Sequence, residues 1–214
     1  MIRSNNEAGR SMIEMLGVLA IIGVLSVGGI AGYSKAMTQY KINKTADQVT
    51  QIVGNVRTLF ASRPDYTVFS NEYMQTGARQ VIQKAHLAPE EMWNSDRTKL
   101  EHPFGGEVTI NYAYDRKGNY TKAFGIQLRD LPEEACMALA TYDWGSGSSS
   151  GLLAIGVNNG SPIMLHDSYS TGSIGTNAAV AVPNGTNVSV PMPVNVAANA
   201  CQEGDSNLVV INFQ

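Results

Sequence analysis

The alternation of apolar and polar residues organises the first third of the chain. A mainly polar stretch of ten residues comes first, and no residue from Met15 to Ser34 is charged. A helix of about twenty residues is just long enough to cross the hydrocarbon core of a bilayer. The pattern therefore predicts a membrane-spanning helix near the N-terminus.

After this run, apolar residues recur in steps of three and four. They are Ile42, Ala46, Val49, Val53, Val56 and Phe60, and polar residues such as Lys44 and Gln48 are expected on the other faces. This spacing is typical of an amphipathic helix that packs on a globular head. Because no proline precedes Pro64, we expect one helix over residues 11–61.

The rest of the chain predicts short helices and a sheet. Helices are expected over residues 78–85 and from near Asp130–Leu131 to about Tyr142, and strands over 108–114, 121–128, 152–157, 163–165 and 208–213. The first two strands form a hairpin, and the last is expected inside the sheet. Residues 167–200 are rich in Gly, Asn and Ser and predict no helix. The fold class is α+β, with a long helix packed on an antiparallel sheet.

Composition and charge narrow the classes of function. The chain has 214 residues, a net charge of −3 and 15% charged residues, so no basic surface for nucleic acid is expected. His86, His102 and His166 are scattered, without metal-ligand spacing or a cysteine partner, and we expect them at the surface. No glycine loop that binds phosphate follows a strand, and no cofactor is expected.

Glu14 stands at the start of the apolar run, where an unpaired charge costs at least a few kcal/mol in lipid. A residue of this kind indicates a partner, although a carboxylate also suits the N-terminal end of a helix. The run also contains Gly17, Gly23, Gly28, Gly29 and Gly32. Glycine weakens a helix but allows helices to approach closely in a membrane. We therefore expect a span that packs against other helices.

The residues before the span do not form an ordinary secretory signal, because no Ala-x-Ala site follows Tyr33. Instead, a short polar leader ends at Gly9, and Glu14 is the fifth residue after it. In this spacing the chain resembles the type IV prepilins. The resemblance implies cleavage between Gly9 and Arg10 by prepilin peptidase, N-methylation of Arg10, and roles for Glu14 and Tyr33 in assembly. Arg10 departs from the family, which usually has Phe, Met or Leu there.

The order of elements further along is similar to the type IVb branch, which includes toxin-coregulated, bundle-forming and thin conjugative pili. The resemblance rests on Pro103-Phe104-Gly105-Gly106, the hairpin, the helix with Cys136, the second cysteine Cys201 and the final strand. The two cysteines could form one disulfide or remain thiols, and export favours the disulfide. In the family such a bond closes the exposed D-region, here residues 136–201.

The resemblance divides the chain into a leader (1–9), a transmembrane and polymerisation half of the helix (10–34), an amphipathic half (35–62) and a globular head (63–214). It implies a structural subunit and not an enzyme, first in the bacterial inner membrane and then in a surface fibre for adhesion, aggregation or conjugation. Its partners would be membrane lipid, prepilin peptidase, the pilus assembly machinery and further copies of itself.

Three alternatives remain open for the sequence. The chain could be a minor pilin or a type II secretion pseudopilin, which forms a short stub. It could be a membrane-anchored binding module that never polymerises. The apolar run could also be a plain signal anchor in which the glutamate occurs by chance.

Overall fold

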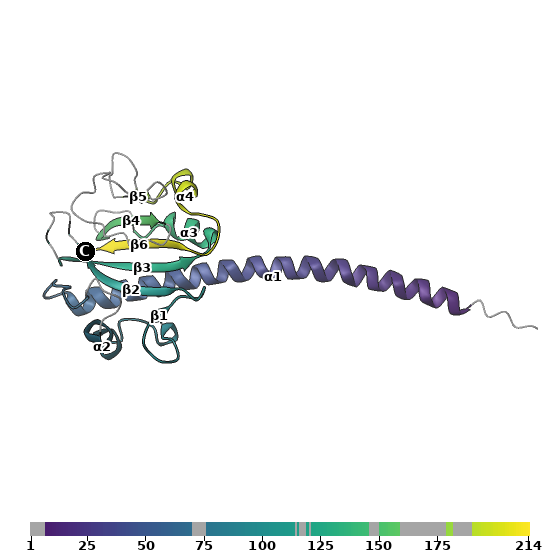
Figure 1. Cartoon of the computed structure of the whole chain (residues 1–214), viewed down its shortest axis with the longest axis horizontal. Coiled ribbons are helices and arrows are strands. Elements are labelled where there is room, and N and C mark those ends of the chain that lie inside the picture. Colours follow the sequence, from purple (N-terminus) through teal and green to yellow (C-terminus); the bar gives the residue numbers. More distant parts are fainter. Residues whose placement is uncertain are drawn as a thin grey trace, which may run out of the picture. The chain divides into compact units, whose positions relative to one another are not determined.

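The computed structural model describes residues 7–69, 76–113, 115, 119, 121–145, 150–158, 179–181 and 190–214. It divides the chain into two compact units, Met1–Tyr40 and Lys41–Gln214. Helix α1 (Glu7–Phe60) provides the described residues of the first unit and opens the second (Figure 1). The prediction of one N-terminal helix ending near residue 61 is therefore confirmed.

Short elements follow α1 in the second unit, which we call the head. They are α2 (Thr76–Lys84), the 3-10 helix η1 (Glu90–Met92), β1 (Leu100–Glu101), β2 (Glu107–Ala113), β3 (Ala123–Leu131), α3 (Glu133–Ala140), β4 (Leu152–Asn158), β5 (Ala179–Ala181), α4 (Val194–Ala200) and β6 (Asn207–Phe213). Helix α3 begins directly after Pro132, with two glutamates in its first turn. Proline and acidic residues are both favourable at a helix start.

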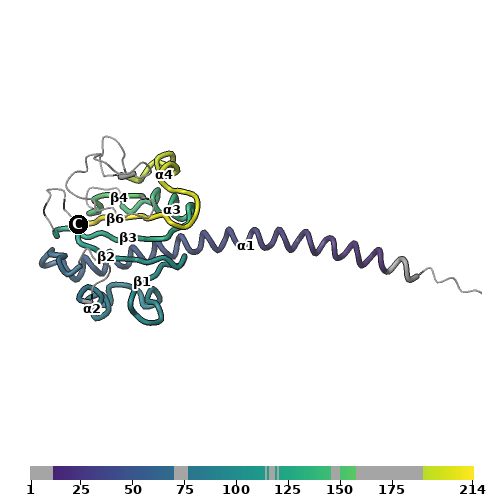
Figure 2. The backbone as a smooth tube through the Cα atoms, in the orientation of Figure 1, coloured from purple at the N-terminus to yellow at the C-terminus, as the bar shows by residue number. Residues whose placement is uncertain are grey.

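In the described part of the chain, six strands form one antiparallel sheet in the order β1-β2-β3-β6-β4-β5. The hairpin β2–β3 and the interior position of the last strand are as predicted. Strand β6 lies between β3 and β4, which brings the C-terminal strand to the middle of the sheet (Figure 2). The chain passes from β3 to β4 through α3.

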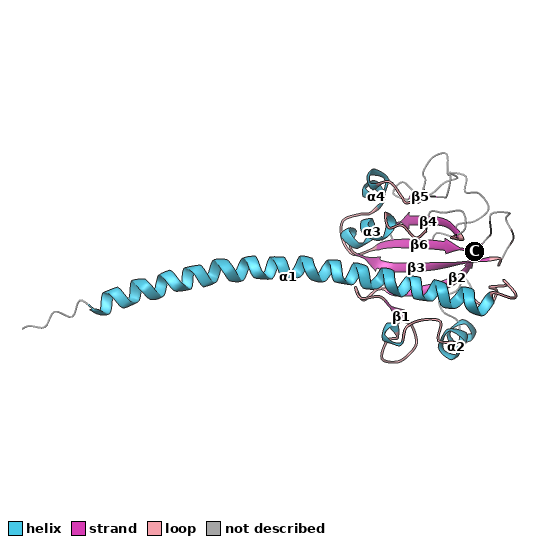
Figure 3. Cartoon of the chain, turned by 180° about the vertical axis from the view of Figure 1, so that it is seen from behind, coloured by secondary structure: helices cyan, strands magenta, loops and turns pink. Residues whose placement is uncertain are grey.

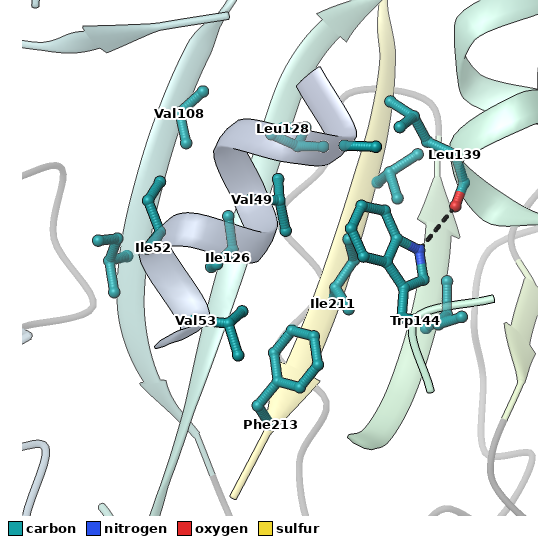
Figure 4. Packing of buried hydrophobic residues seen from close by; sticks show 14 of the residues in the cluster. Val49, Ile52, Val53, Val108, Ile126, Leu128, Leu139, Trp144, Ile211 and Phe213 are labelled. Atoms are coloured by element: carbon teal, nitrogen blue, oxygen red, sulfur yellow. Dashed lines mark hydrogen bonds between the residues drawn. The ribbon is translucent and has the colours of Figure 1, made fainter. Parts of the chain in front are cut away.

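The head part of α1 packs across one face of this sheet (Figure 3). The pairing of the strands places four isoleucines side by side across β2, β3, β6 and β4. They are Ile110, Ile126, Ile211 and Ile155. Val49, Ile52 and Val53 of α1 meet these strands (Figure 4), and all of these side chains are buried. Burying an aliphatic side chain of this size contributes about 1.5–3 kcal/mol relative to leaving it exposed, so this layer stabilises the head.

Several predictions of secondary structure need correction. Residues 167–200 were expected to lack a helix, but Val194–Ala200 form α4 after Pro193, whose fixed backbone angle suits a helix start. Asp130–Leu131 belong to β3, where the register shifts, so α3 begins later than predicted. The predicted strand at 163–165 lies outside the described residues.

Candidate functional site

The first unit presents an apolar helix surface. Between Met12 and Tyr33, the large apolar side chains are between 53% and 75% exposed. By length and composition this helix could cross a membrane. Within the unit, then, these side chains remain available to lipid or to other helices, and the surface is a candidate site for both.

Glu14 lies in α1 at one end of this apolar surface, and its side chain is exposed. Tyr33 lies at the other end and is 68% exposed. Gly9 and Arg10 fall in the first turns of α1, and the Arg10 side chain is outside the described part of the chain. The predicted roles of these residues in cleavage, methylation and assembly stay predictions.

The glycines of the span leave open space on the helix surface. A side-chain carbon added at Gly17, Gly23, Gly28, Gly29 or Gly32 would meet no atom within 4 Å. None of these glycines is needed for packing within this chain's described residues. Their positions are therefore free for contact with another helix, for which small residues are favourable.

In the head, the predicted apolar stripe of α1 is buried, from Ile42 to Val56, with Phe60 half-buried. Gln48 is a correction, because it was expected on a polar face and is only 3% exposed. Its Nε2 donates to the Glu91 carboxylate at 3.2 Å, and Lys44 forms an ion pair with the same carboxylate. These two donors lower the pKa of Glu91 below its ordinary value. The hydrogen bond from Gln48 and the ion pair with Lys44 therefore attach η1 to α1.

Arg57 connects α1 to the loop before β4 and to the end of β6. Its guanidinium donates to the Ser150 carbonyl oxygen at 2.6 Å and lies 5.2 Å from the centre of the Phe213 ring. Burial lowers the pKa of Arg57, and nearby Tyr66 partly opposes this shift. The guanidinium also fills the space that a side chain at Gly151 would occupy. The end of α1 is thus fixed to the loop before β4.

A disulfide joins Cys136 of α3 to Cys201, which follows α4. The bond confirms the predicted pairing, and both residues are buried. The chain after Cys201 is held by Asn207, whose Nδ2 donates to the carbonyl oxygens of Leu131 and Gln202 at 3.0 and 2.9 Å. Its Oδ1 accepts a hydrogen bond from the Gln202 N–H at 2.7 Å. The disulfide and this amide fix the closed region to the end of β3.

The histidines differ from the expectation in one case. His86 is exposed as predicted, whereas His102 is buried, because β3 and the turn after His102 enclose its ring. His166 lies outside the described residues. Within the described ranges, no group of three or more His, Cys, Asp or Glu residues is placed to hold a metal ion.

Sequence reasoning missed Arg57, His102 and Asn207 as contact residues. Arg57 lies four residues after Val53 and three before Phe60, which places it beside the apolar stripe of α1 and is a weak signal of partial burial. His102 precedes the recognised Pro103-Phe104-Gly105-Gly106 turn, and a histidine there could have been tested as a turn residue. For Asn207 we find no local signal.

These features define a class of protein. An apolar helix continues into an amphipathic half packed on an antiparallel sheet, and a disulfide closes the region between α3 and β6. This is the α+β fold of the type IV pilins, which are structural proteins and not enzymes.

Comparisons with known proteins identify the family. Residues 34–213 match the Bundlin family, and the chain belongs to that family, within the type IVb pilins. The toxin coregulated pilin of Vibrio cholerae serotype O1 (strain ATCC 39315 / El Tor Inaba N16961) is 22% identical over 140 residues. The match covers 65% of this chain and 59% of that pilin, so the chain spans about three fifths of this relative's length.

A solved type IV pilin shows the same fold. The crystal structure of TcpA, a type IV pilin from Vibrio cholerae El Tor biotype, has 17% sequence identity and a TM-score of 0.53, covering 82% of this chain and 99% of that one. A type IVb pilin from Salmonella typhi has 15% identity and a TM-score of 0.49, covering 80% and 99% of the two chains.

Proposed function

We propose that this chain is the precursor of a structural subunit of a type IV pilus. It resides in the bacterial inner membrane, prepilin peptidase cleaves it between Gly9 and Arg10 and methylates the new N-terminus, and the assembly machinery adds it to a surface fibre. The fibre serves adhesion, aggregation or conjugation. The observation that carries the proposal is the exposed apolar surface of α1, which has one carboxylate at its start.

This surface needs an apolar environment both before and after assembly. Each exposed aliphatic side chain that leaves water contributes about 1.5–3 kcal/mol. Lipid supplies this environment for the precursor. Neighbouring copies of α1 supply it in the fibre, and the open positions at the glycines favour close approach between helices.

Glu14 gives this packing a register. Cleavage after Gly9 would place a positive amine on Arg10, one helical turn, or about 6 Å, before Glu14. A neighbouring subunit displaced along the fibre brings its own amine to the Glu14 carboxylate. Two such charges about 4 Å apart attract by about 4 kcal/mol at an effective dielectric constant near 20. An unpaired Glu14 among apolar helices would be unfavourable, which selects the paired arrangement.

The proposal is tested by mass spectrometry of the N-terminus of filaments sheared from cells. The expected subunit begins with N-methylated Arg10. Gly9→Leu should remain full-length in the membrane and form no fibres, whereas the control Gly17→Leu, which lies beyond the cleavage site, should still be cleaved.

Three results would contradict the proposal: trimming of the Gly9→Leu chain, a different mature N-terminus, and a full-length wild-type chain that forms no fibre. The last result would favour the membrane-anchored binding module. Recovery only as a trace component of fibres built from another subunit would favour a minor pilin.

A further inference from the structure

The turn between β1 and β2 is closed by one buried histidine. The backbone N–H of His102 donates to the Gly106 carbonyl oxygen at 3.0 Å, and the backbone N–H of Gly105 donates to the His102 carbonyl oxygen at 2.8 Å. The His102 side chain folds back into the turn and is 3% exposed. It therefore lies between the turn and the neighbouring strand, away from water.

Both ring nitrogens of His102 have backbone partners. Nε2 lies 2.7 Å from the Arg129 carbonyl oxygen, which can only accept, so Nε2 carries the hydrogen. Nδ1 lies 3.2 Å from the Phe104 nitrogen and accepts the hydrogen bond from that N–H. Only the neutral ring with hydrogen on Nε2 makes both bonds.

The space around the ring is also closed. A side-chain carbon at Gly106 would lie 2.0 Å from the Arg129 oxygen and 2.6 Å from His102 Nε2. Glycine is therefore required at position 106 for β3 and the turn to approach this closely. The ring cannot shift to accommodate another hydrogen without opening this contact.

We propose that residues His102–Gly106 form an acid-operated latch, closed by neutral His102 and opened when Nδ1 takes up a proton. A hydrogen on Nδ1 would face the Phe104 N–H, placing two donors against each other. The Phe104 N–H must then leave the ring. Because Lys41 of α1 lies 5.4 Å from the centre of the Phe104 ring, opening the turn also releases this contact with α1.

The surroundings of His102 shift its pKa in opposite directions: nearby charges raise it and burial lowers it. Among the described residues, Glu101 on β1 and Asp130 on β3 favour the protonated ring, while the Arg129 guanidinium donates to Gln127 Oε1 and Lys41 faces Phe104. Burial is the larger effect and lowers the pKa of His102 below its ordinary value of 6.5. The closed state therefore excludes a proton that the open, hydrated state accepts as pH falls below 6.5.

The latch can be tested by amide hydrogen exchange of the full chain in detergent micelles, from about pH 7.5 to about pH 4.5. After correction for the chemical exchange rate, the opening constant for Phe104 and Gly105 should rise by about tenfold per pH unit below the pKa of the open state, as expected for one proton. Amides of Ile126 and Ile211 in the sheet should stay protected. Nitrogen NMR at neutral pH should find the hydrogen of His102 on Nε2.

Three variants isolate the histidine. His102→Gln can still donate to the Arg129 carbonyl but cannot take up a proton, so exchange in the turn should lose its pH dependence. The control His86→Gln, at an exposed site, should keep the wild-type response. Because β3 stays folded when the turn opens, the Asp130 carboxylate also favours the protonated ring in the open state. Asp130→Asn removes this charge from an exposed site, so the opening should shift to lower pH.

Three results would overturn the proposal: no acid response in the wild-type turn, the same response in His102→Gln, and loss of protection across β3 and β6 at the same pH as in the turn. The exposed Asp130→Asn variant keeps the test informative if His102→Gln does not fold.

Discussion

Removing the disulfide should destabilise the head strongly while leaving α1 intact. The change is the double variant Cys136→Ala/Cys201→Ala, and the bond that it removes closes a segment with a sequence separation of 65 residues. Both cysteines are buried, so reduced wild-type protein is the matched control that retains the sulfur atoms. The stability that both proteins lose relative to the oxidised protein is the contribution of the crosslink. Any further loss in the double variant is the contribution of packing by the sulfur atoms.

The expected magnitude follows from chain entropy. Closing a loop of this length removes about 4 kcal/mol of conformational free energy from the unfolded chain. The net stability of a domain is about 5–15 kcal/mol, so the loss is a large share of it. Because the effect acts on the unfolded state, contacts such as the Asn207 bonds to Leu131 and Gln202 should persist in the folded variant.

Urea unfolding of the full chain in detergent measures this loss. Trp144 is a suitable fluorescent reporter, since its indole N–H donates to the Leu139 carbonyl oxygen at 2.9 Å, close to Cys136. Both the reduced protein and the double variant should lose about 4 kcal/mol and show a larger dependence of unfolding free energy on urea. A loss below about 1 kcal/mol in both would refute the entropic argument.

Four further predictions use single substitutions. Glu14→Ala should leave head unfolding unchanged but abolish fibres; normal fibre yield by electron microscopy would exclude the pairing role. Ile52→Ala, at a fully buried position, should cost about 2–5 kcal/mol in urea unfolding. Gly151→Ala should also destabilise the head, because φ is +69° and the new carbon would meet the Gln214 oxygen; an unchanged unfolding midpoint would contradict this. Since the pKa of Glu91 is lowered from 4.5, its contribution is present above that pH and lost below it. Glu91→Gln should therefore reduce the acid sensitivity of unfolding, measured from pH 7 to about pH 3.

Apart from the Cys136–Cys201 disulfide, which follows from the cysteine count and the expected export, the features predicted correctly are those encoded by neighbours in sequence. The apolar stripe from Ile42 to Val56 follows the helical period and is buried as expected. The β2–β3 hairpin was recognisable from its alternation and its short connection. Glu14 was singled out because it is a carboxylate at the start of the apolar run, whereas Tyr33 was named through the resemblance to the type IV prepilins.

Weak local patterns account for the errors. Helix α4 has only seven residues, about two turns, and its three alanines favour a helix but stand among Val and Asn residues that do not. Gln48 lies on the buried face of α1. A polar side chain is tolerated there because its amide N–H donates a hydrogen bond to the Glu91 carboxylate. In both cases tertiary contacts decide the outcome.

The contacts that sequence reasoning could not supply join residues far apart in the chain. Arg57 and Ser150 are 93 positions apart, Asn207 and Leu131 are 76 apart, and His102 and Arg129 are 27 apart. Each bond pairs a polar side chain with a backbone carbonyl, and a carbonyl is present at almost every residue, so the sequence does not mark the acceptor. The tertiary fold selects the acceptor; for Asn207 and Leu131 it is the pairing of β3 with β6. Assembly through α1, in contrast, depends on a linear arrangement of glycine, carboxylate and apolar run, and so it can be proposed from the sequence before the fold of the head is known.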